Sequence, residues 1–425
     1  MASSITAPRG TRDMLPDEGY QWHYIEKTVA EVAQAFGFQE IRVPTFEHTE
    51  LFARGVGDTT DVVQKEMYTF ADKGGRSITL RPEGTAGTAR AAIEHALFSG
   101  ALPVGLYYAL SCFRYEKPQA GRLREFHQFG VELFGTKEAS ADAMVISLAG
   151  EVFRRLGVKG LALEINSIGC PTCRAAYLAA LRAYFSQYRD QLCATCQSRL
   201  ESNPMRILDC KSPVCGEIAR KAPVILDYLC ADCQSHFEKL KHYLTLAGFA
   251  YQVNPRIVRG LDYYTRTVFE FVCDAIGAQG TVCGGGRYDG LICELGGPEM
   301  PGLGFGMGLE RLIAVMKAQG LPFGEQARPA LYLAGLGEAA VDKAFELASM
   351  LRAHGVQAVH DVMNRSLKAQ MKYANKIGAR YTLVIGEEEL ARGAAVLKDM
   401  DGGENTPVKL EAPALLAAIG ASSPA

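Results

Sequence analysis

The chain lacks the features that mark several large classes of protein. Its 425 residues contain no uninterrupted apolar run of membrane length, so we predict no membrane-spanning segment. The start, MASSITAPRGTRDMLP, has no long apolar segment after its charges, and we expect no secretory signal and a soluble protein of the cytoplasm. A net charge of −2 argues against a surface coated with basic residues, although it allows a local basic face.

Common nucleotide-binding and metal-binding motifs are missing as well. There is no GxxxxGKS/T phosphate loop, no HExxH and no Rossmann GxGxxG after a first strand. The composition, 48% hydrophobic and 22% charged, is nevertheless typical of a folded globular protein. If the protein binds a nucleotide, it must do so in another way.

The order of the expected elements divides the chain. In the first part, short β-rich runs alternate with helical ones, and two long strands (105–115 and 125–134) form an antiparallel hairpin, which favours an α+β fold. Near the C-terminus, strands and helices alternate regularly, which predicts a small α/β domain. We therefore expect a core made of residues 1–169 and 248–325, a helical insertion at 170–247 and a separate domain at 330–425.

The hairpin carries a row of polar residues. Arg114 and Glu116 are two apart on the first expected strand, so their side chains share a face. Gln128 and Glu132 share a face of the return strand, while apolar residues occupy the other face. A solvated sheet face would explain this row, and so would the floor of a polar pocket into which Arg122 reaches from the loop.

Other segments add polar and glycine-rich positions. In GLGFGMGLERL, a glycine at every second position leaves one strand face bare, either for a crowded helix contact or for a bulky ligand near Arg311. RGLDYYTRTVFEF offers Arg259, Tyr263 and Tyr264. In TLRPEGTAGTARA we expect Thr85 as a helix N-cap, with Glu83 just before it, for which simple capping is one explanation. Together these arginines and carboxylates suit phosphoryl chemistry on an amine-bearing substrate.

Eight of the twelve cysteines fall within the expected insertion. In an intracellular protein such a cluster predicts metal ligands more readily than disulfides. CPTC, CATC and CADC have the spacing of zinc knuckles, and a looser pair follows the second of them. Two Cys₄ zinc sites, a single site or a reduced structural remnant would all fit. The eight residues are Cys170, Cys173, Cys193, Cys196, Cys210, Cys215, Cys230 and Cys233.

A basic run lies in the C-terminal domain. Its residues are spaced three, four, four and four apart, which predicts a stripe on one helix face. Such a stripe is commonly a solvated face, but the repulsion between like charges would be relieved by an RNA backbone. The residues are Arg365, Lys368, Lys372, Lys376 and Arg380.

Five segments of the chain resemble motifs of one enzyme family. FRYEKPQAGRLREFHQFGVE resembles motif 2 of class II aminoacyl-tRNA synthetases, and GLGFGMGLERL resembles motif 3. GFQEIRVPTFEHTELF is similar to motif 1, which builds the dimer interface in that class. RGLDYYTRTVFEF and GGGRYDGL resemble the signatures of its histidine-specific members. The resemblance covers nearly the whole chain.

The resemblance implies a fold and a reaction. The expected fold is an antiparallel six-stranded catalytic sheet flanked by helices, in a homodimer with C-terminal anticodon-binding domains. The expected reaction joins L-histidine to the 3′ end of histidine tRNA through a histidyl-adenylate. It consumes ATP with Mg²⁺ and releases AMP and pyrophosphate. In the family the insertion leans towards the tRNA acceptor stem, so zinc there would be structural.

The resemblance also implies roles for individual residues. It assigns catalysis to Arg259, Arg114 and Gln128. It assigns histidine binding to Glu83, Thr85, Arg114, Gln128, Glu132, Arg259, Tyr263 and Tyr264, with Glu132 and Tyr264 at the imidazole. It assigns ATP binding to Arg114, Glu116, Arg122 and Arg311, and tRNA binding to the basic run.

Two alternative functions share parts of this pattern. One is a regulatory subunit of ATP phosphoribosyltransferase, which is built on the same core but is expected to lack the C-terminal domain. The other is a tRNA-binding protein without ligase activity. The catalytic set and the C-terminal domain are both present, which favours the ligase.

Overall fold

A computed structural model describes residues 5–57, 60, 62–118, 121–210, 212–257, 262–273 and 280–420. The chain divides into two compact units, Met1–Gly324 and Glu325–Ala425, and each is described by itself. Among the described residues, no helix is both long enough and apolar enough to cross a membrane.

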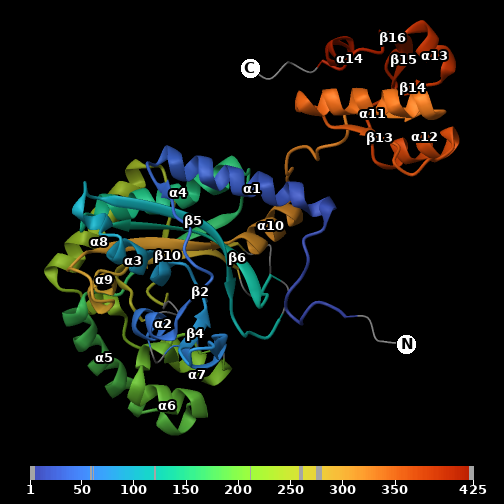
Figure 1. Cartoon of the computed structure of the whole chain (residues 1–425). Coiled ribbons are helices and arrows are strands. Elements are labelled where there is room, and N and C mark those ends of the chain that lie inside the picture. Colours follow the sequence, from blue (N-terminus) through green and yellow to red (C-terminus); the bar gives the residue numbers. More distant parts are fainter. Residues whose placement is uncertain are drawn as a thin grey trace. The chain divides into compact units, whose positions relative to one another are not determined.

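An eight-stranded sheet runs through the first unit (Figure 1). Its order is β1-β5-β6-β11-β10-β9-β7-β8. The six inner strands pair antiparallel, which confirms the predicted six-stranded sheet, and β1 and β8 add two-residue parallel edges. The strands are β1 (Gln39–Glu40), β5 (Val104–Phe113), β6 (Glu125–Phe134), β7 (Leu161–Ser167), β8 (Gln252–Val253), β9 (Thr265–Cys273), β10 (Thr281–Arg287) and β11 (Gly302–Gly308).

The two faces of this sheet differ in chemistry. Helices α1 (Pro16–Ala35), α4 (Ala139–Arg155), α8 (Ala231–Leu246) and α10 (Leu309–Ala318) contribute to the main core on one face. Phe129, Val131 and Leu133 of β6 are buried in that core, as their alternation predicts. Gln128 and Glu132 therefore point to the other face, where β6 contacts α3 (Thr85–Glu94).

One boundary differs from the sequence prediction. Strand β5 ends at Phe113, so Arg114 and Glu116 follow the strand and do not lie on it. A small sheet of β2 (Phe46–His48), β4 (Ser77–Leu80) and β3 (Thr69–Ala71) lies beside this region. The unit also contains α2 (Thr49–Val56), α9 (Leu291–Glu294) and the short turns η1 (Val62–Glu66) and η2 (Leu97–Ser99).

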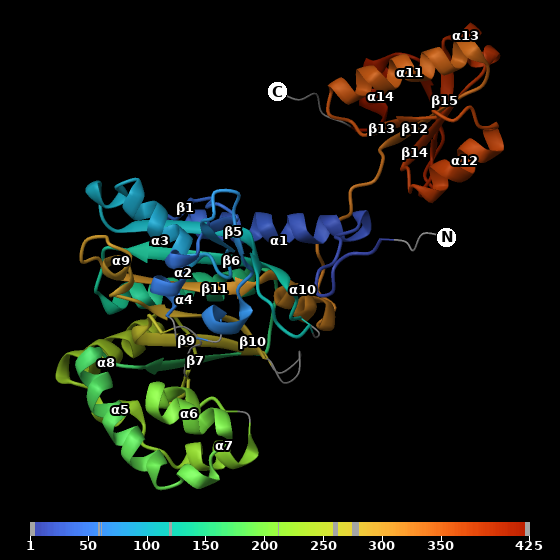
Figure 2. The same cartoon turned by 60° about the horizontal axis from the view of Figure 1, so that its bottom comes forward.

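The insertion is helical, as predicted. Figure 2 shows α5, α6 and α7 gathered on the side of the sheet formed by β7 and β9. Their side chains share a hydrophobic cluster with Tyr263, Tyr264 and Tyr288, which lie outside the insertion. Besides α8, the insertion consists of α5 (Pro171–Ser186), η3 (Arg189–Gln191), α6 (Ala194–Ser202), η4 (Pro204–Ile207), α7 (Pro213–Arg220) and η5 (Ile225–Tyr228).

The second unit is an α/β domain, as predicted. Its sheet has the order β13-β12-β14-β15-β16, in which the first three strands are parallel and the last two join antiparallel. The strands are β12 (Leu331–Gly335), β13 (Ala358–His360), β14 (Tyr381–Ile385), β15 (Ala394–Asp399) and β16 (Thr406–Lys409). The helices are α11 (Glu338–Ala353), α12 (Leu367–Lys376), α13 (Glu387–Arg392) and α14 (Ala412–Ala418).

Candidate active site

A buried carboxylate, Glu132, lies at the centre of the polar face. Its oxygens accept hydrogen bonds from the hydroxyls of Thr85 at 2.8 Å and Tyr108 at 2.9 Å, and from that of Tyr288. Burial raises the pKa of Glu132 to about 8, because the loss of water outweighs these hydrogen bonds. A ligand that brings a cation or an N–H donor would favour the charged form.

The strand glycines make room for this pocket. A Cβ atom at Gly304 would collide with the carboxylate of Glu132, and one at Gly306 would collide with the side-chain amide of Gln128. A Cβ atom at Gly130 would likewise collide with the ring of Tyr108. The bare face of β11 therefore accommodates side chains of the protein itself, which neither of the two explanations from the sequence included.

The start of α3 differs from the prediction. The helix begins at Thr85, so the N-cap position is Gly84, and the expected N-cap role of Thr85 is wrong. The carboxylate of Glu83 instead accepts hydrogen bonds from the backbone N–H groups of Thr85 at 2.6 Å and Ala86 at 2.9 Å. Burial raises the pKa of Glu83. Because Glu83 satisfies the helix end, the Thr85 hydroxyl is available to Glu132.

A second cavity of about 260 Å³ adjoins this pocket. Gln128 belongs to both, since it lines the cavity and its side-chain oxygen accepts the N–H of Gly84 at 3.2 Å. The cavity brings together the residues predicted to bind ATP, although they come from the segment between β5 and β6 and from α10. They are Arg114, Glu116, Arg122 and Arg311.

The arginines of the second cavity are held in place. Arg114 donates from Nε to the carbonyl of Pro82 at 2.8 Å, and its guanidinium lies 5.3 Å from the ring centre of Phe126. Arg122 pairs with the carboxylate of Glu116. Arg311 donates to the carbonyl of Thr281 at 2.6 Å. Three guanidinium groups and one carboxylate give this cavity a net positive charge, which suits a polyphosphate.

Two pocket tyrosines were missed from the sequence. Tyr108 and Tyr288 both donate to Glu132, whereas the sequence predicted Tyr263 and Tyr264 as the pocket tyrosines. The latter pair is buried, with ring centres 4.7 Å apart, and Tyr263 lies 5.4 Å from Tyr288. Tyr288 belongs to GGGRYDGL and so could have been found, but Tyr108 reveals itself only through its pairing with Gly130 across the hairpin.

The predicted catalytic Arg259 lies outside the described residues. The remaining residues predicted to bind histidine all lie in described parts of the chain. Thr85 and Glu132 are in direct contact, and Glu83 and Gln128 bond the backbone at the start of α3.

The eight insertion cysteines form two groups of four. In each group, the four sulfur atoms lie within 4.8 Å of one another. In the first group, the sulfur of Cys170 lies 3.5 Å from that of Cys173 and 3.9 Å from that of Cys230. The first group is Cys170, Cys173, Cys230 and Cys233, and the second is Cys193, Cys196, Cys210 and Cys215.

The basic stripe is shorter than predicted. Lys368, Lys372 and Lys376 are exposed on α12 at intervals of four. Arg365 precedes the helix and pairs with Asp361 at 2.7 Å, and Arg380 follows the helix. The five residues therefore do not share one helix, because α12 spans only Leu367–Lys376.

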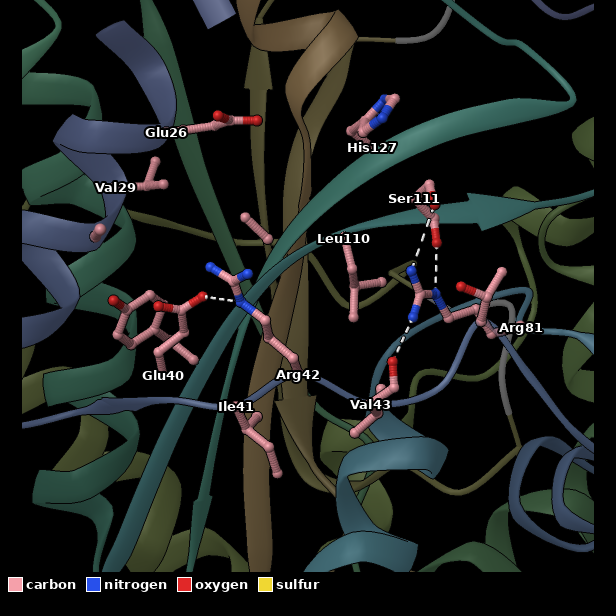
Figure 3. Close-up of a pocket in the computed structure, with 14 residues that line it drawn as sticks. Glu26, Val29, Glu40, Ile41, Arg42, Val43, Arg81, Leu110, Ser111 and His127 are labelled. Atoms are coloured by element: carbon pink, nitrogen blue, oxygen red, sulfur yellow. Dashed lines mark hydrogen bonds and ion pairs between the residues drawn. The ribbon is translucent and has the colours of Figure 1, made fainter. Parts of the chain in front are cut away.

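Another cavity, of about 550 Å³, lies elsewhere in the first unit (Figure 3). It follows the segment Ile41–Val43 between α1 and β5. Arg81 donates there to the carbonyls of Val43 at 2.7 Å and Ser111 at 2.6 Å. Its described lining contains none of the predicted histidine- or ATP-binding residues.

Both units match known protein families. Residues 10–312 match the family described as histidyl-tRNA synthetase, and residues 322–414 match the anticodon binding domain family. Histidine–tRNA ligases of Acetivibrio thermocellus and Caldanaerobacter subterraneus subsp. tengcongensis are each 55% identical over 405 residues, which cover 95% of this chain and 97% of the relative. The crystal structure of apo S. aureus histidyl-tRNA synthetase is 39% identical, with a TM-score of 0.84 and coverage of 98% of this chain and 100% of that chain.

Proposed function

The chain belongs to the histidyl-tRNA synthetase family, and from this premise we propose how its residues divide the reaction between them. It attaches histidine to tRNA by the aminoacyl-tRNA synthetase reaction, on a class II fold. This identity disfavours a purely regulatory subunit and a tRNA-binding protein without ligase activity. Histidine-dependent exchange of pyrophosphate into ATP is the direct test.

One observation carries the placement of the substrates. Gln128 lies where the pocket of Glu132 meets the cationic cavity. A histidine with its imidazole at Glu132 and Tyr264 would have its amino group near Glu83, Thr85 and Gln128. Its carboxylate would then face a phosphate chain held in the cavity, which is the geometry that adenylate formation requires.

The cationic cavity would hold ATP. Arg114 and Arg122 would contact the phosphates with Glu116 beside them, and Arg311 would cover the adenine and reach the γ-phosphate. Mg²⁺ enters as the companion of ATP and offsets phosphate charge, and Glu116 is the carboxylate among the described lining residues that would neighbour it. This division leaves the polar face of Glu132 to the amino acid.

The chemical step joins two anions. The carboxylate of histidine attacks the α-phosphate, so repulsion contributes to the barrier, and Arg114 and Arg259 would offset it from two sides. The 3′-hydroxyl of tRNA then attacks the mixed anhydride and releases AMP. Selection of histidine follows from the Glu132 pocket, because its buried hydroxyls and carboxylate would lose a partner if the bound ring lacked nitrogens.

We assign tRNA contacts to the second unit and the insertion. Residues 1–169 and 248–325 would form the catalytic core, 170–247 an insertion near the acceptor stem, and 330–425 the anticodon-binding domain. The exposed lysines of α12 would bind phosphates, with Arg365 and Arg380 at its ends.

Reversing two of these charges should weaken tRNA binding selectively. In Lys372→Glu/Lys376→Glu, we expect the KM for tRNA to rise about tenfold or more at moderate salt, with pyrophosphate exchange intact. The matched control is Lys398→Glu/Lys409→Glu, which reverses two exposed lysines of the same unit. An equal rise in both variants would contradict a specific role for α12.

We propose a homodimer along the segment that resembles motif 1. The 550 Å³ cavity opens beside Ile41–Val43, and the nearby Phe46 is 58% exposed. The proposal rests on the resemblance of this segment to motif 1, which builds the dimer interface in its class, and the exposed Phe46 fits a surface that another subunit covers. Sedimentation equilibrium should give twice the mass of the chain, and a monomer at micromolar concentration would contradict the interface.

Each cysteine group would bind one zinc ion. Sulfur ligands at the usual Zn–S distance stand about 3.8 Å apart in a tetrahedral site, close to the separations of 3.5 and 3.9 Å. Backbone N–H groups donate to the sulfurs of Cys173 and Cys215, at 3.1 and 3.2 Å, and such hydrogen bonds would orient these sulfurs as ligands. The proposed cytoplasmic location keeps thiols reduced. The zinc would be structural, outside the reaction.

Metal analysis tests this assignment. Protein purified without chelator should contain about two zinc ions per chain, and stripping them should lower the Tm by several degrees, because metal binding stabilises only the folded insertion. Protein that contains no zinc would contradict the proposal. One ion per chain would mean that only one of the two cysteine groups binds zinc.

A further inference from the structure

The insertion contacts the loop that shapes the histidine pocket. Arg174 of α5 donates to the backbone carbonyl of Tyr264 and, at 3.5 Å, to that of Asp262. The two carbonyls belong to the residues on either side of Tyr263, whose ring packs at a tilt against Tyr264 and edge-on against Tyr288. Tyr288 in turn donates to Glu132. A chain of direct contacts therefore runs from α5 of the insertion to the central carboxylate of the pocket.

A second contact from the insertion holds the same loop. The side-chain amide of Asn203, which follows α6, donates to the carboxylate of Asp262 at 3.3 Å. The N–H of Asp262 donates to the carbonyl of Val56 at 3.2 Å, at the end of α2. The loop is thus clamped between the insertion and α2.

The first cysteine group anchors Arg174. Cys173 is its neighbour in sequence, and Cys170 stands at the start of the same helix. The residues just before Cys170 are tied to the sheet, because Arg266 exchanges backbone hydrogen bonds with Ile168 and Gly169 at 2.7 and 2.9 Å. Whatever fixes Cys170 and Cys173 to Cys230 and Cys233 therefore also fixes the position from which Arg174 reaches the loop. The second group also borders a clamp, because α6 contains Cys196 and is followed by Asn203. Arg174, however, directly follows Cys173, whereas Asn203 lies at the far end of α6 from Cys193, so we expect the first group to hold its clamp more tightly.

We propose that Arg174 is a positioning residue for histidine binding, and that the first cysteine group, by holding α5, couples the insertion to the affinity for histidine. The proposal rests on the proposed placement of histidine at Glu132 and Tyr264. A guanidinium suits this role because its planar fork can donate to two carbonyls at once, which an ammonium group does less well. Loss of the Arg174 contacts would let Tyr263 and Tyr264 shift without disturbing the cavity proposed for ATP.

Kinetics of pyrophosphate exchange separate this role from a general structural one. Arg174→Ala should raise the KM for histidine about tenfold or more, leave the KM for ATP within about twofold and retain both zinc ions. Arg174→Lys should recover part of the loss. Arg182→Ala, which removes an exposed arginine from the same helix, is the matched control and should behave as the wild type. Asn203→Ala, which removes the second clamp, should raise the KM for histidine in the same selective way.

Variants of the two cysteine groups provide a second, independent test of the proposal. Cys230→Ser and Cys210→Ser should each lose one zinc ion, but the KM for histidine of Cys230→Ser should exceed that of Cys210→Ser about tenfold. Equal histidine KM values would overturn the coupling through the first group. An unchanged histidine KM in both folded Arg174→Ala and Asn203→Ala, or equal rises for histidine and ATP, would overturn the positioning role. Absence of histidine-dependent exchange in the wild type would instead refute the proposed function itself.

Discussion

Replacing Glu132 with glutamine is expected to raise the KM for histidine roughly 30- to 150-fold while changing the KM for ATP little. The carboxylate is buried and central to the pocket, so its loss removes a charged hydrogen-bond acceptor, worth about 2–3 kcal/mol. Glu132 is not among the described residues that line the cavity proposed for ATP, so the KM for ATP should be unaffected. Steady-state exchange with varied histidine and varied ATP measures both constants, and equal rises would contradict the division of the site.

The same substitution should stabilise the protein without substrate. The pKa of Glu132 is raised to about 8, above the value of about 4.3 in an unfolded chain. Between these values the unfolded chain releases the proton while the folded protein keeps it, so folding stability falls as pH rises through this window. Glu132→Gln removes that loss, which is on the order of a few kcal/mol above pH 8.

Thermal unfolding at several pH values tests whether Glu132→Gln stabilises the protein in this pH-dependent way. The Tm of Glu132→Gln should exceed that of the wild type at pH 8 and approach it near pH 4. Exposed Glu217→Gln is the control and should show no such pH-dependent gain. A variant that is less stable than the wild type at pH 8 would show that the glutamate is not strained in the free pocket.

Replacing Arg259 with alanine is expected to lower histidine-dependent pyrophosphate exchange by about 10²- to 10³-fold, mainly through kcat. Removal of one preorganised donor to the charge that develops in the transition state costs about 3–4 kcal/mol. The assignment to Arg259 comes from the family resemblance of RGLDYYTRTVFEF, and Arg259 itself lies outside the described residues.

Two controls separate a chemical role of Arg259 from a structural one: the Tm of Arg259→Ala and the activity of Arg259→Lys. The Tm should change by no more than about 2 °C in Arg259→Ala if the role is chemical. Arg259→Lys should retain more activity than alanine but less than the wild type, because lysine keeps the charge without the fork of donors. Exchange near the wild-type rate in Arg259→Ala would remove Arg259 from the mechanism.

The polar face of the sheet was predictable because its signal is local. Alternation along β6 separates Gln128 and Glu132 from Phe129 and Val131, and a period of two is enough to assign faces. The partners of Glu132 were harder to predict. Tyr108 meets it only because β5 pairs with β6 in a register that sets Tyr108 opposite Gly130, and that register is not visible in either strand alone.

The cysteine pairing illustrates the same limit. The CxxC spacing indicated metal binding, but spacing alone gave no reason to group Cys170 and Cys173 with Cys230 and Cys233. The fold decides this, because it brings the start of α5 and the start of α8 together. The basic stripe failed for a local reason: Arg365 is engaged by Asp361 before α12 begins, so the helix is shorter than the run of charges.

The most direct measurement is pyrophosphate exchange with each of the twenty amino acids, for the wild type and Glu132→Gln. The account predicts that histidine alone supports rapid exchange in the wild type. In the Glu132→Gln variant, histidine should remain the preferred substrate but require much higher concentrations. Rapid exchange with another amino acid, or a histidine KM that Glu132→Gln leaves unchanged, would contradict the claim that the Glu132 pocket selects histidine.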